Sequence, residues 1–189
     1  MLDDPNVLPD DLPVPVDDGA AGHLAHMAVP DIALVATSGV PVSLARLSGR
    51  TVVYAYPKTG VPGQPLPTPD WNSIPGARGC TPQSCAFRDH FAELRAAGAA
   101  ALYGLSTQAT AYQREVAGRL HLPFALLSDA ELKLTNALRL PTFTRSGEVF
   151  LRRLTLILRD GRIEHVMYPV FPSDRNAADV LAWLHANPA

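Results

Sequence analysis

The chain has 189 residues, of which 18% are charged, and its formal net charge is -2. This length suits one domain with a proper core, and the charge excludes a basic field that would gather nucleic acid or an anionic membrane. Its apolar runs fall short of the roughly 20 residues of a membrane span, and its acidic start lacks the basic and apolar segments of a secretory signal. We therefore expect a cytoplasmic protein that binds neither nucleic acid nor membrane and takes a small substrate.

The first part of the chain predicts an arm followed by a strand-rich start of a domain. Residues 1–28 are rich in Asp, Pro, Gly and Ala without apolar periodicity, which indicates an extended or partly ordered N-terminal arm. We place the domain at residues 29–189. Its first strands are expected at residues 32–35 and, as a buried run of β-branched and aromatic residues, at 51–56. The proline-rich stretch 58–79 predicts a loop too long to be a plain connection.

Helical and strand patterns alternate from Cys80 onward. Pro82 suits a first helical turn and Gly98 suits a helix end, so one helix is predicted between Cys80 and that glycine. The pair Asp160-Gly161 favours a type I′ hairpin. The other expected elements are strands at 100–105 and 124–127, helices at 109–120 and 132–138 (the latter opened by a capping box beginning at Ser128), strands at 148–158 and 162–169, and a C-terminal helix at about 177–184. This order predicts an α/β, thioredoxin-like fold with a central mixed β-sheet flanked by helices.

Cys80 and Cys85 are the only cysteines and stand at the start of a predicted helix. At a helix N-terminus, unpaired amides and the helix dipole favour the thiolate of Cys80 over its thiol, and a second cysteine can capture what the first becomes. On an intact helix the two Cα atoms stand roughly 8.6 Å apart, beyond the about 7 Å that a disulfide tolerates. A bond between them would require the first helical turns to unwind, which makes the pair a candidate conformational switch.

A cysteine pair at a helix start can also serve purposes other than redox chemistry. The two residues can be inert parts of the core, because cysteine is often buried. A zinc site is disfavoured, since Cys80, Cys85 and His90 lack the usual ligand spacing and a fourth ligand is not evident, so we expect no metal. In a compartment that keeps thiols reduced, a cysteine pair is more often catalytic, redox-sensing or metal-binding than structural.

Several segments carry a family likeness, and they occur in the right order along the chain: Val53-Tyr54-Ala55-Tyr56-Pro57-Lys58, Gly79-Cys80-Thr81 through Cys85 to Phe87-Arg88-Asp89, Gly104-Leu105-Ser106-Thr107, and Leu122-Pro123-Phe124-Ala125-Leu126-Leu127-Ser128-Asp129. With these segments the chain resembles the peroxiredoxins, most closely the bacterioferritin-comigratory or peroxiredoxin Q type. The resemblance implies a cofactor-free thiol peroxidase that reduces hydrogen peroxide and organic hydroperoxides. It makes Cys80 the peroxidatic cysteine and Cys85 the resolving one, through an intramolecular disulfide.

The same resemblance assigns Arg153 to the reactive sulfur, a choice between Arg152 and Arg153 that periodicity alone does not make. It implies a thioredoxin-like or low-molecular-weight thiol as reductant, and we expect a monomer or a weak homodimer. The family usually has Thr or Ser three positions before the reactive cysteine, where this chain has Ala77. In the family, the loop from the Tyr-Pro dipeptide to that cysteine is also much shorter than in this chain. Thr59 is our candidate for the missing hydroxyl in substrate binding, provided the loop returns the chain to the same spot, and Thr81 and Ser73 are weaker candidates.

Two other functions stay open at this point. A thiol-disulfide oxidoreductase acting on protein disulfides would use similar sulfur chemistry, although the pair is not a C-x-x-C motif. A non-catalytic redox sensor or binding module, in which a disulfide switches a surface, is compatible with Ala77 and with the long loop.

Overall fold

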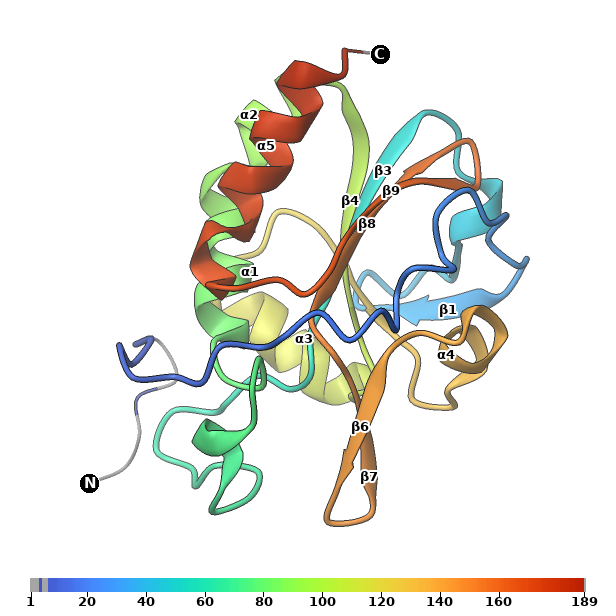
Figure 1. Ribbon diagram of the computed structural model, residues 1–189. Coiled ribbons are helices and arrows are strands. Elements are labelled where there is room, and N and C mark those ends of the chain that lie inside the picture. The colour runs from blue at the N-terminus through green and yellow to red at the C-terminus, as the bar shows by residue number, and fades with distance from the viewer. Residues whose placement is uncertain (1–3, 5–6, 189) are drawn as a thin grey trace.

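The computed structural model describes residue 4 and residues 7–188, so residues 1–3 and 5–6 of the predicted arm, and residue 189, lie outside the described part. Its centre is a seven-stranded sheet with strand order β2-β1-β5-β4-β3-β8-β9 (Figure 1). The strands are β1 (Ala33–Ala36), β2 (Val42–Ser43), β3 (Arg50–Ala55), β4 (Ala99–Ser106), β5 (Leu126–Ser128), β8 (Leu154–Arg159) and β9 (Arg162–Met167). The β3, β4 and β5 strands are parallel, whereas β8 and β9 extend the sheet antiparallel. The predicted central mixed sheet is therefore confirmed.

Helices cover both faces of this sheet. They are α1 (Cys80–Asp89), α2 (Phe91–Ala96), α3 (Thr110–Arg119), α4 (Lys133–Leu138) and α5 (Asn176–Ala186), with short 3-10 turns η1 (Leu44–Arg46), η2 (Trp71–Ser73) and η3 (Ser173–Arg175). Figure 1 shows α1, α2 and α5 side by side on one face, where α3 also packs, and α4 on the opposite side. In the described part, none of the helices has the length and apolar character needed to traverse a bilayer.

The central strand β3 supplies side chains to two separate cores. Val52 and Tyr54 point toward α1, α2, α3 and α5, whereas Val53 and Ala55 point toward α4. This division follows from the strand geometry, in which successive side chains face opposite sides of the sheet. On the first side the Tyr54 ring stacks on Phe87 of α1, with ring centroids 4.3 Å apart. The helix that begins at Cys80 is thereby anchored to the middle of the sheet.

Part of the predicted N-terminal arm packs against the domain. Ala21 and Leu24 are buried in the core that contains α4, and Ala28 forms a β-bridge with Arg162 of β9. Apolar side chains without regular periodicity can still fill a core when they come from a turn, and sequence periodicity cannot detect that. The boundary after residue 28 stays a prediction.

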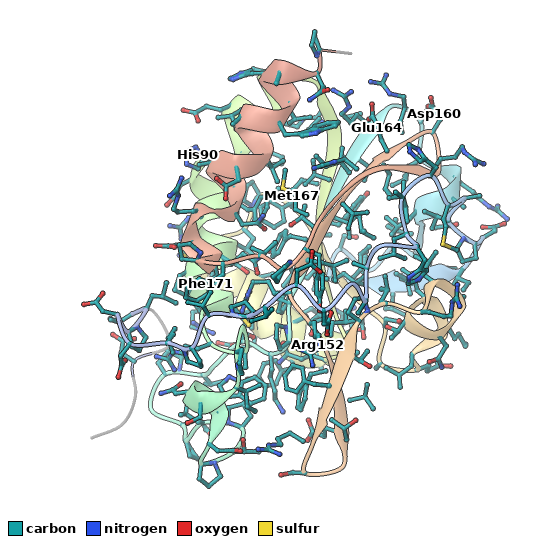
Figure 2. The ribbon with its side chains drawn as sticks, viewed as in Figure 1. His90, Arg152, Asp160, Glu164, Met167 and Phe171 are labelled. Carbon is teal, nitrogen blue, oxygen red and sulfur yellow. The ribbon has the colours of Figure 1, made fainter. Side chains whose placement is uncertain are left out.

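The helix predicted from Cys80 to Gly98 is interrupted. It divides at His90, labelled in Figure 2, whose backbone angles of φ -90° and ψ 5° lie outside the regular helix. The second piece, α2, lets Phe91 contact Phe124 at a centroid distance of 5.8 Å. Since the apolar spacing continues through the break, the pattern alone could not reveal it.

The strand predicted at residues 148–158 is likewise two strands. Its first part is β7 (Glu148–Leu151), which pairs with a strand that the sequence did not predict, β6 (Thr142–Arg145), in a separate hairpin. The chain leaves the strand conformation at Arg152 and Arg153 before entering β8. Figure 2 shows Arg152 near this junction. The interruption allows the side chain of Arg153 to turn inward, as described below.

The structure confirms the predicted hairpin turn but not the predicted helix cap. Asp160 and Gly161 both have positive φ, 48° and 74°, as the predicted type I′ hairpin requires. The capping box predicted at Ser128 is wrong, because α4 begins only at Lys133 and its N-cap residue is Leu132, while the Ser128 hydroxyl donates to the Gln108 carbonyl. The Asp129 carboxylate caps α4, accepting hydrogen bonds from the backbone of Leu134 (3.1 Å) and from that of the following residue.

Candidate active site

Cys80 is the first residue of α1 and is buried, with 3% of its surface exposed. Gly79 precedes it with φ 98°, a conformation that favours glycine. A Cβ atom at this position would also lie 2.2 Å from the Ser173 hydroxyl oxygen and 2.7 Å from a methyl carbon of Leu8. The first helical hydrogen bond runs from the Gln83 amide to the Gly79 carbonyl (3.0 Å). The sequence thus places the Cys80 sulfur at a helix N-terminus, as predicted.

Arg153 reaches the same sulfur from the junction between β7 and β8. Its Nη2 lies 3.2 Å from the Cys80 Sγ, and the guanidinium is buried, with 3% of the residue exposed. The same nitrogen donates to the carbonyls of Gly76 (3.3 Å), Ala77 (3.4 Å) and Arg78 (3.1 Å). Arg153 therefore fixes the end of the long loop and brings a permanent positive charge to the sulfur. Of the two adjacent arginines, the one selected by the family resemblance makes this contact.

Sequence reasoning missed a chain of polar residues behind Arg153. The Arg153 Nη1 donates to Oε1 of Gln83, and Nε2 of Gln83 donates to Oδ1 of Asn176 (2.8 Å). The hydroxyl of Thr155 donates to the same Asn176 oxygen (2.8 Å). Gln83 and Asn176 are separated by 93 residues along the chain, so only the folded packing of α1, β8 and α5 could bring them together.

Cys85 lies on the same intact helix, and both cysteines are free thiols. It is half-buried and packs against the core that contains Tyr54 and Phe87. Burial raises the pKa of the Cys85 thiol above its ordinary value, an effect opposed by Arg88. Cys85 is therefore kept protonated at neutral pH, in a position where the helix must open before its sulfur meets Cys80.

The predicted substrate-binding residue Thr59 is buried but is engaged elsewhere. Its hydroxyl and its backbone amide both approach Oε1 of Gln108, at 3.3 and 3.2 Å, and its carbonyl accepts a hydrogen bond from the Tyr112 hydroxyl (2.8 Å). Within the described residues, Thr59 thus bonds to Gln108 rather than to the Cys80 sulfur. The side chain of Ala77, which stands where the family usually has its hydroxyl, packs with Trp71 and Phe150.

Two other buried hydroxyls belong to this part of the core. The hydroxyls of Tyr56 and Thr81 make no hydrogen bond to any of the described residues. Burial raises the pKa of Tyr56 well above its ordinary value, and the nearby Tyr54 and Cys80 add to this effect. The Tyr56 phenol is therefore held as an uncharged donor close to the Cys80 sulfur.

Aromatic side chains hold the long loop 58–79 against the β6–β7 hairpin. The Trp71 ring lies 5.1 Å from Phe150 and 5.9 Å from Phe143 between centroids, and Asp70 forms an ion pair with Arg145. The loop thus has a small apolar core of its own, shared with the hairpin. Its contacts converge on Ala77, next to Cys80.

The N-terminal segment also reaches the end of this loop. The Arg78 guanidinium donates to the carbonyls of Asp4 and Val7, the latter at 3.2 Å. Leu8 lies against Gly79, as its closeness to a Cβ at that position shows. The first described residues of the chain therefore lie across the turn that leads into α1.

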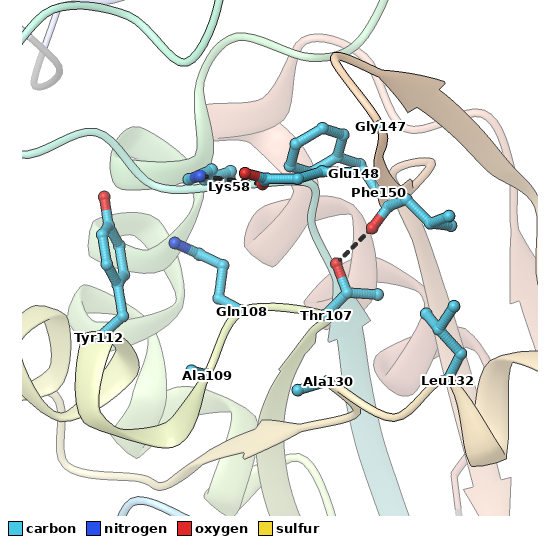
Figure 3. A pocket seen from close by; sticks show the side chains of 11 residues that line it. Lys58, Thr107, Gln108, Ala109, Tyr112, Ala130, Leu132, Gly147, Glu148 and Phe150 are labelled. Carbon is cyan, nitrogen blue, oxygen red and sulfur yellow. Dashed lines mark hydrogen bonds and ion pairs between the residues drawn. The ribbon is translucent and has the colours of Figure 1, made fainter.

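A cavity of about 510 Å³ opens between Lys58, Gln108 and Tyr112 (Figure 3). Lys58 and Glu148 form an ion pair at its rim, with 3.1 Å between nitrogen and oxygen. Figure 3 shows the amide nitrogen of Gln108 directed into the space between Tyr112 and Lys58. The remaining walls include Thr107, Leu132 and Phe150. The cavity could admit a small molecule of mixed polarity next to the start of the long loop.

Side chains of the metal-ligating types are dispersed over the fold. Among residues 4 and 7–188, no three side chains of the His, Cys, Asp or Glu type gather at a distance that could hold an ion. The site described above consists instead of one sulfur, one guanidinium and a set of neutral hydrogen-bonding groups.

Comparisons with known proteins indicate the same family as the sequence motifs. The redoxin family model matches residues 24–181. Peroxiredoxin Bcp of Escherichia coli is 30% identical over 169 residues, covering 87% of this chain and 94% of the relative. The chloroplastic peroxiredoxin Q of Oryza sativa subsp. japonica is 29% identical over 84% of this chain, which spans 65% of the length of the rice protein.

Solved structures agree with the fold. Peroxidoxin BcpB of Mycobacterium tuberculosis aligns with a TM-score of 0.69 and 25% identity, over 87% of this chain and 98% of the other. Peroxiredoxin Q of Xanthomonas campestris aligns with a TM-score of 0.64 and 21% identity, over 94% and 98% of the two chains. These likenesses confirm the predicted thioredoxin-like fold. The chain belongs to the redoxin family, and within it to the peroxiredoxins of the Q and Bcp type.

Proposed function

We propose that this protein is a thiol-dependent peroxidase in which Cys80 attacks hydrogen peroxide or an organic hydroperoxide. The observation that carries the proposal is the Arg153 Nη2 at 3.2 Å from the Cys80 sulfur, at the N-terminus of α1. Only a thiolate attacks peroxide, and a guanidinium together with helix amides favours that anion. The same donors can stabilise the charge that develops on the leaving oxygen.

The reaction balances with the two cysteines and one external reductant. The Cys80 thiolate forms a bond to one peroxide oxygen as the O–O bond breaks, and the other oxygen leaves as water or an alcohol after taking a proton. The resulting sulfenic acid condenses with the Cys85 thiol, releasing water and forming the disulfide. A dithiol of the thioredoxin type, or two equivalents of a small thiol, then reduces the disulfide and is itself oxidised.

Several finer points belong to the same proposal. The reductant requirement favours the cytoplasm or a similarly reducing compartment. We expect a monomer or a weak homodimer, with no cofactor, and a domain that begins after residue 28. Thr59 remains the proposed substrate-side hydroxyl, because a hydroxyl that donates to Gln108 still has lone pairs to accept a hydrogen bond from peroxide.

One equivalent of hydrogen peroxide added to the reduced protein tests this function. The expected product is an intramolecular disulfide, seen as the loss of two hydrogen atoms by mass spectrometry and of both free thiols. The Cys85→Ser variant should consume one equivalent and leave an oxidised Cys80, whereas Cys80→Ser should consume almost none. Retention of both thiols in the wild type would refute the proposal. Oxidation of Cys80 by peroxide at a rate far too slow for a peroxidase would favour a redox sensor.

A further inference from the structure

The side-chain amide of Gln83 can support Arg153 in only one orientation. An arginine has donors and no acceptor, so only the oxygen end of an amide can face it. Gln83 is fully buried, and its Oε1 is the atom that accepts from Arg153. Its Nε2 must then find an acceptor on the other side, since a buried donor without a partner is costly.

Asn176 supplies that acceptor from a different element. It is the first residue of α5 and is 1% exposed, and its Oδ1 lies 2.8 Å from the Gln83 Nε2. The Thr155 hydroxyl, buried on β8, donates to the same oxygen at 2.8 Å. If the Asn176 amide were turned over, its nitrogen would oppose the nitrogen of Gln83, and both amides would have to turn. The amide nitrogen of Gln83 would then face a guanidinium that can only donate.

We propose that Asn176, assisted by Thr155, is a positioning residue for the peroxidase reaction. It holds the amide of Gln83 so that its oxygen fixes the Arg153 guanidinium against the Cys80 sulfur. This inference rests on the proposed function and deepens it, because it extends the site from α1 to the start of the C-terminal helix. Neither Asn176 nor Thr155 makes a hydrogen bond to the sulfur, so both act through Gln83 and Arg153.

A double-mutant cycle with Gln83→Glu separates positioning from mere support of the fold. Asn176→Leu removes the acceptor and leaves the Gln83 amide free to turn away from Arg153. In a Cys85→Ser background, we expect the rate constant for oxidation of Cys80 by hydrogen peroxide to fall about five- to twentyfold. A glutamate at position 83 has an acceptor oxygen at both ends, so its orientation no longer matters. In that background Asn176→Leu should change the rate less than about twofold.

A pair of threonine variants keeps the test valid if Asn176→Leu does not fold. Thr155→Val preserves shape while removing the donor to Asn176, and should slow oxidation about two- to fivefold. Thr51→Val is the matched control, because Thr51 is also buried in the sheet and its hydroxyl makes no hydrogen bond to the described residues. We expect the control to leave the rate unchanged.

A second readout distinguishes failure of this inference from failure of the proposed function. Alkylation of Cys80 by iodoacetamide senses the guanidinium beside the sulfur without requiring any peroxide chemistry. If the wild type fails to react with peroxide, the function is refuted while alkylation rates still test the positioning. Two results would overturn the inference. Asn176→Leu could leave both the alkylation rate and the oxidation rate of Cys80 at their wild-type values, or it could slow oxidation by the same factor whether residue 83 is Gln or Glu.

Discussion

Replacing Arg153 with Met tests the centre of the proposed site. The guanidinium nitrogen lies 3.2 Å from the sulfur, and both residues are 3% exposed. At an effective dielectric constant of about 20, a unit positive charge at that distance attracts a thiolate by about 5 kcal/mol, part of which is offset by the cost of burying both charges. Charged hydrogen bonds contribute about 1.5–3 kcal/mol net, so we expect oxidation of Cys80 to slow by about 10- to 150-fold.

The assay is the second-order rate constant for oxidation by hydrogen peroxide in a Cys85→Ser background. This background isolates the first chemical step, because no resolving thiol is present. Arg153→Lys keeps the charge but cannot span both Cys80 and Gln83, so its rate should fall between those of the wild type and Arg153→Met. The neighbouring Arg152 is the matched control, since its side chain donates to the Thr142 carbonyl and not to the sulfur. A rate for Arg153→Met within twofold of wild type, or an equal loss for Arg152→Met, would refute the reasoning.

Two further predictions concern stability. Gly79→Ala should lower the melting temperature, because its Cβ would lie 2.2 Å from the Ser173 hydroxyl and the φ of 98° costs an L-residue about 1–2 kcal/mol. Gly118→Ala is the control: this position in α3 has open space, so the substitution should stabilise the protein by up to about 1 kcal/mol. A melting temperature unchanged in Gly79→Ala would contradict this. Burial lowers the pKa of His165 from 6.5, so the unfolded chain binds more protons and the free energy of unfolding should decrease as pH falls below about 6.5. His165→Phe keeps the stacking on Trp183, at 4.9 Å between centroids, and should remove that part of the slope between pH 7 and pH 5 in urea titrations; an unchanged slope would disprove the assignment.

The features predicted correctly are those written in local sequence. The buried strand β3, the helix start at Cys80 and the turn at Asp160 depend on residues within a few positions of one another. The boundaries that failed have a long-range cause. The predicted strand 148–158 is broken because Arg153 turns toward a loop more than 70 residues earlier, at residues 76–78.

The candidate site divides in the same way. Cys80 and Cys85 could be found from composition and spacing, and Arg153 from the family resemblance. Gln83 and Asn176 carry no local signal, because a glutamine in a helix and an asparagine at a helix start are ordinary surface residues in most sequences. Their importance arises only when two helices and a strand are packed together. The contacts of Thr59 could not be foreseen either, since its partner Gln108 lies 49 residues away in another loop.

The N-terminal segment that crosses Gly79 should respond to the oxidation of the two cysteines. Joining Cys80 to Cys85 requires the first turn of α1 to open, and that turn is in contact with Leu8, while Arg78 binds the carbonyl of Val7. Formation of the disulfide should therefore detach the start of the chain from the domain. Protease cleavage within residues 7–15 should then be faster in the oxidised protein than in the reduced one, so the chain end itself would report the oxidation state of the two sulfur atoms.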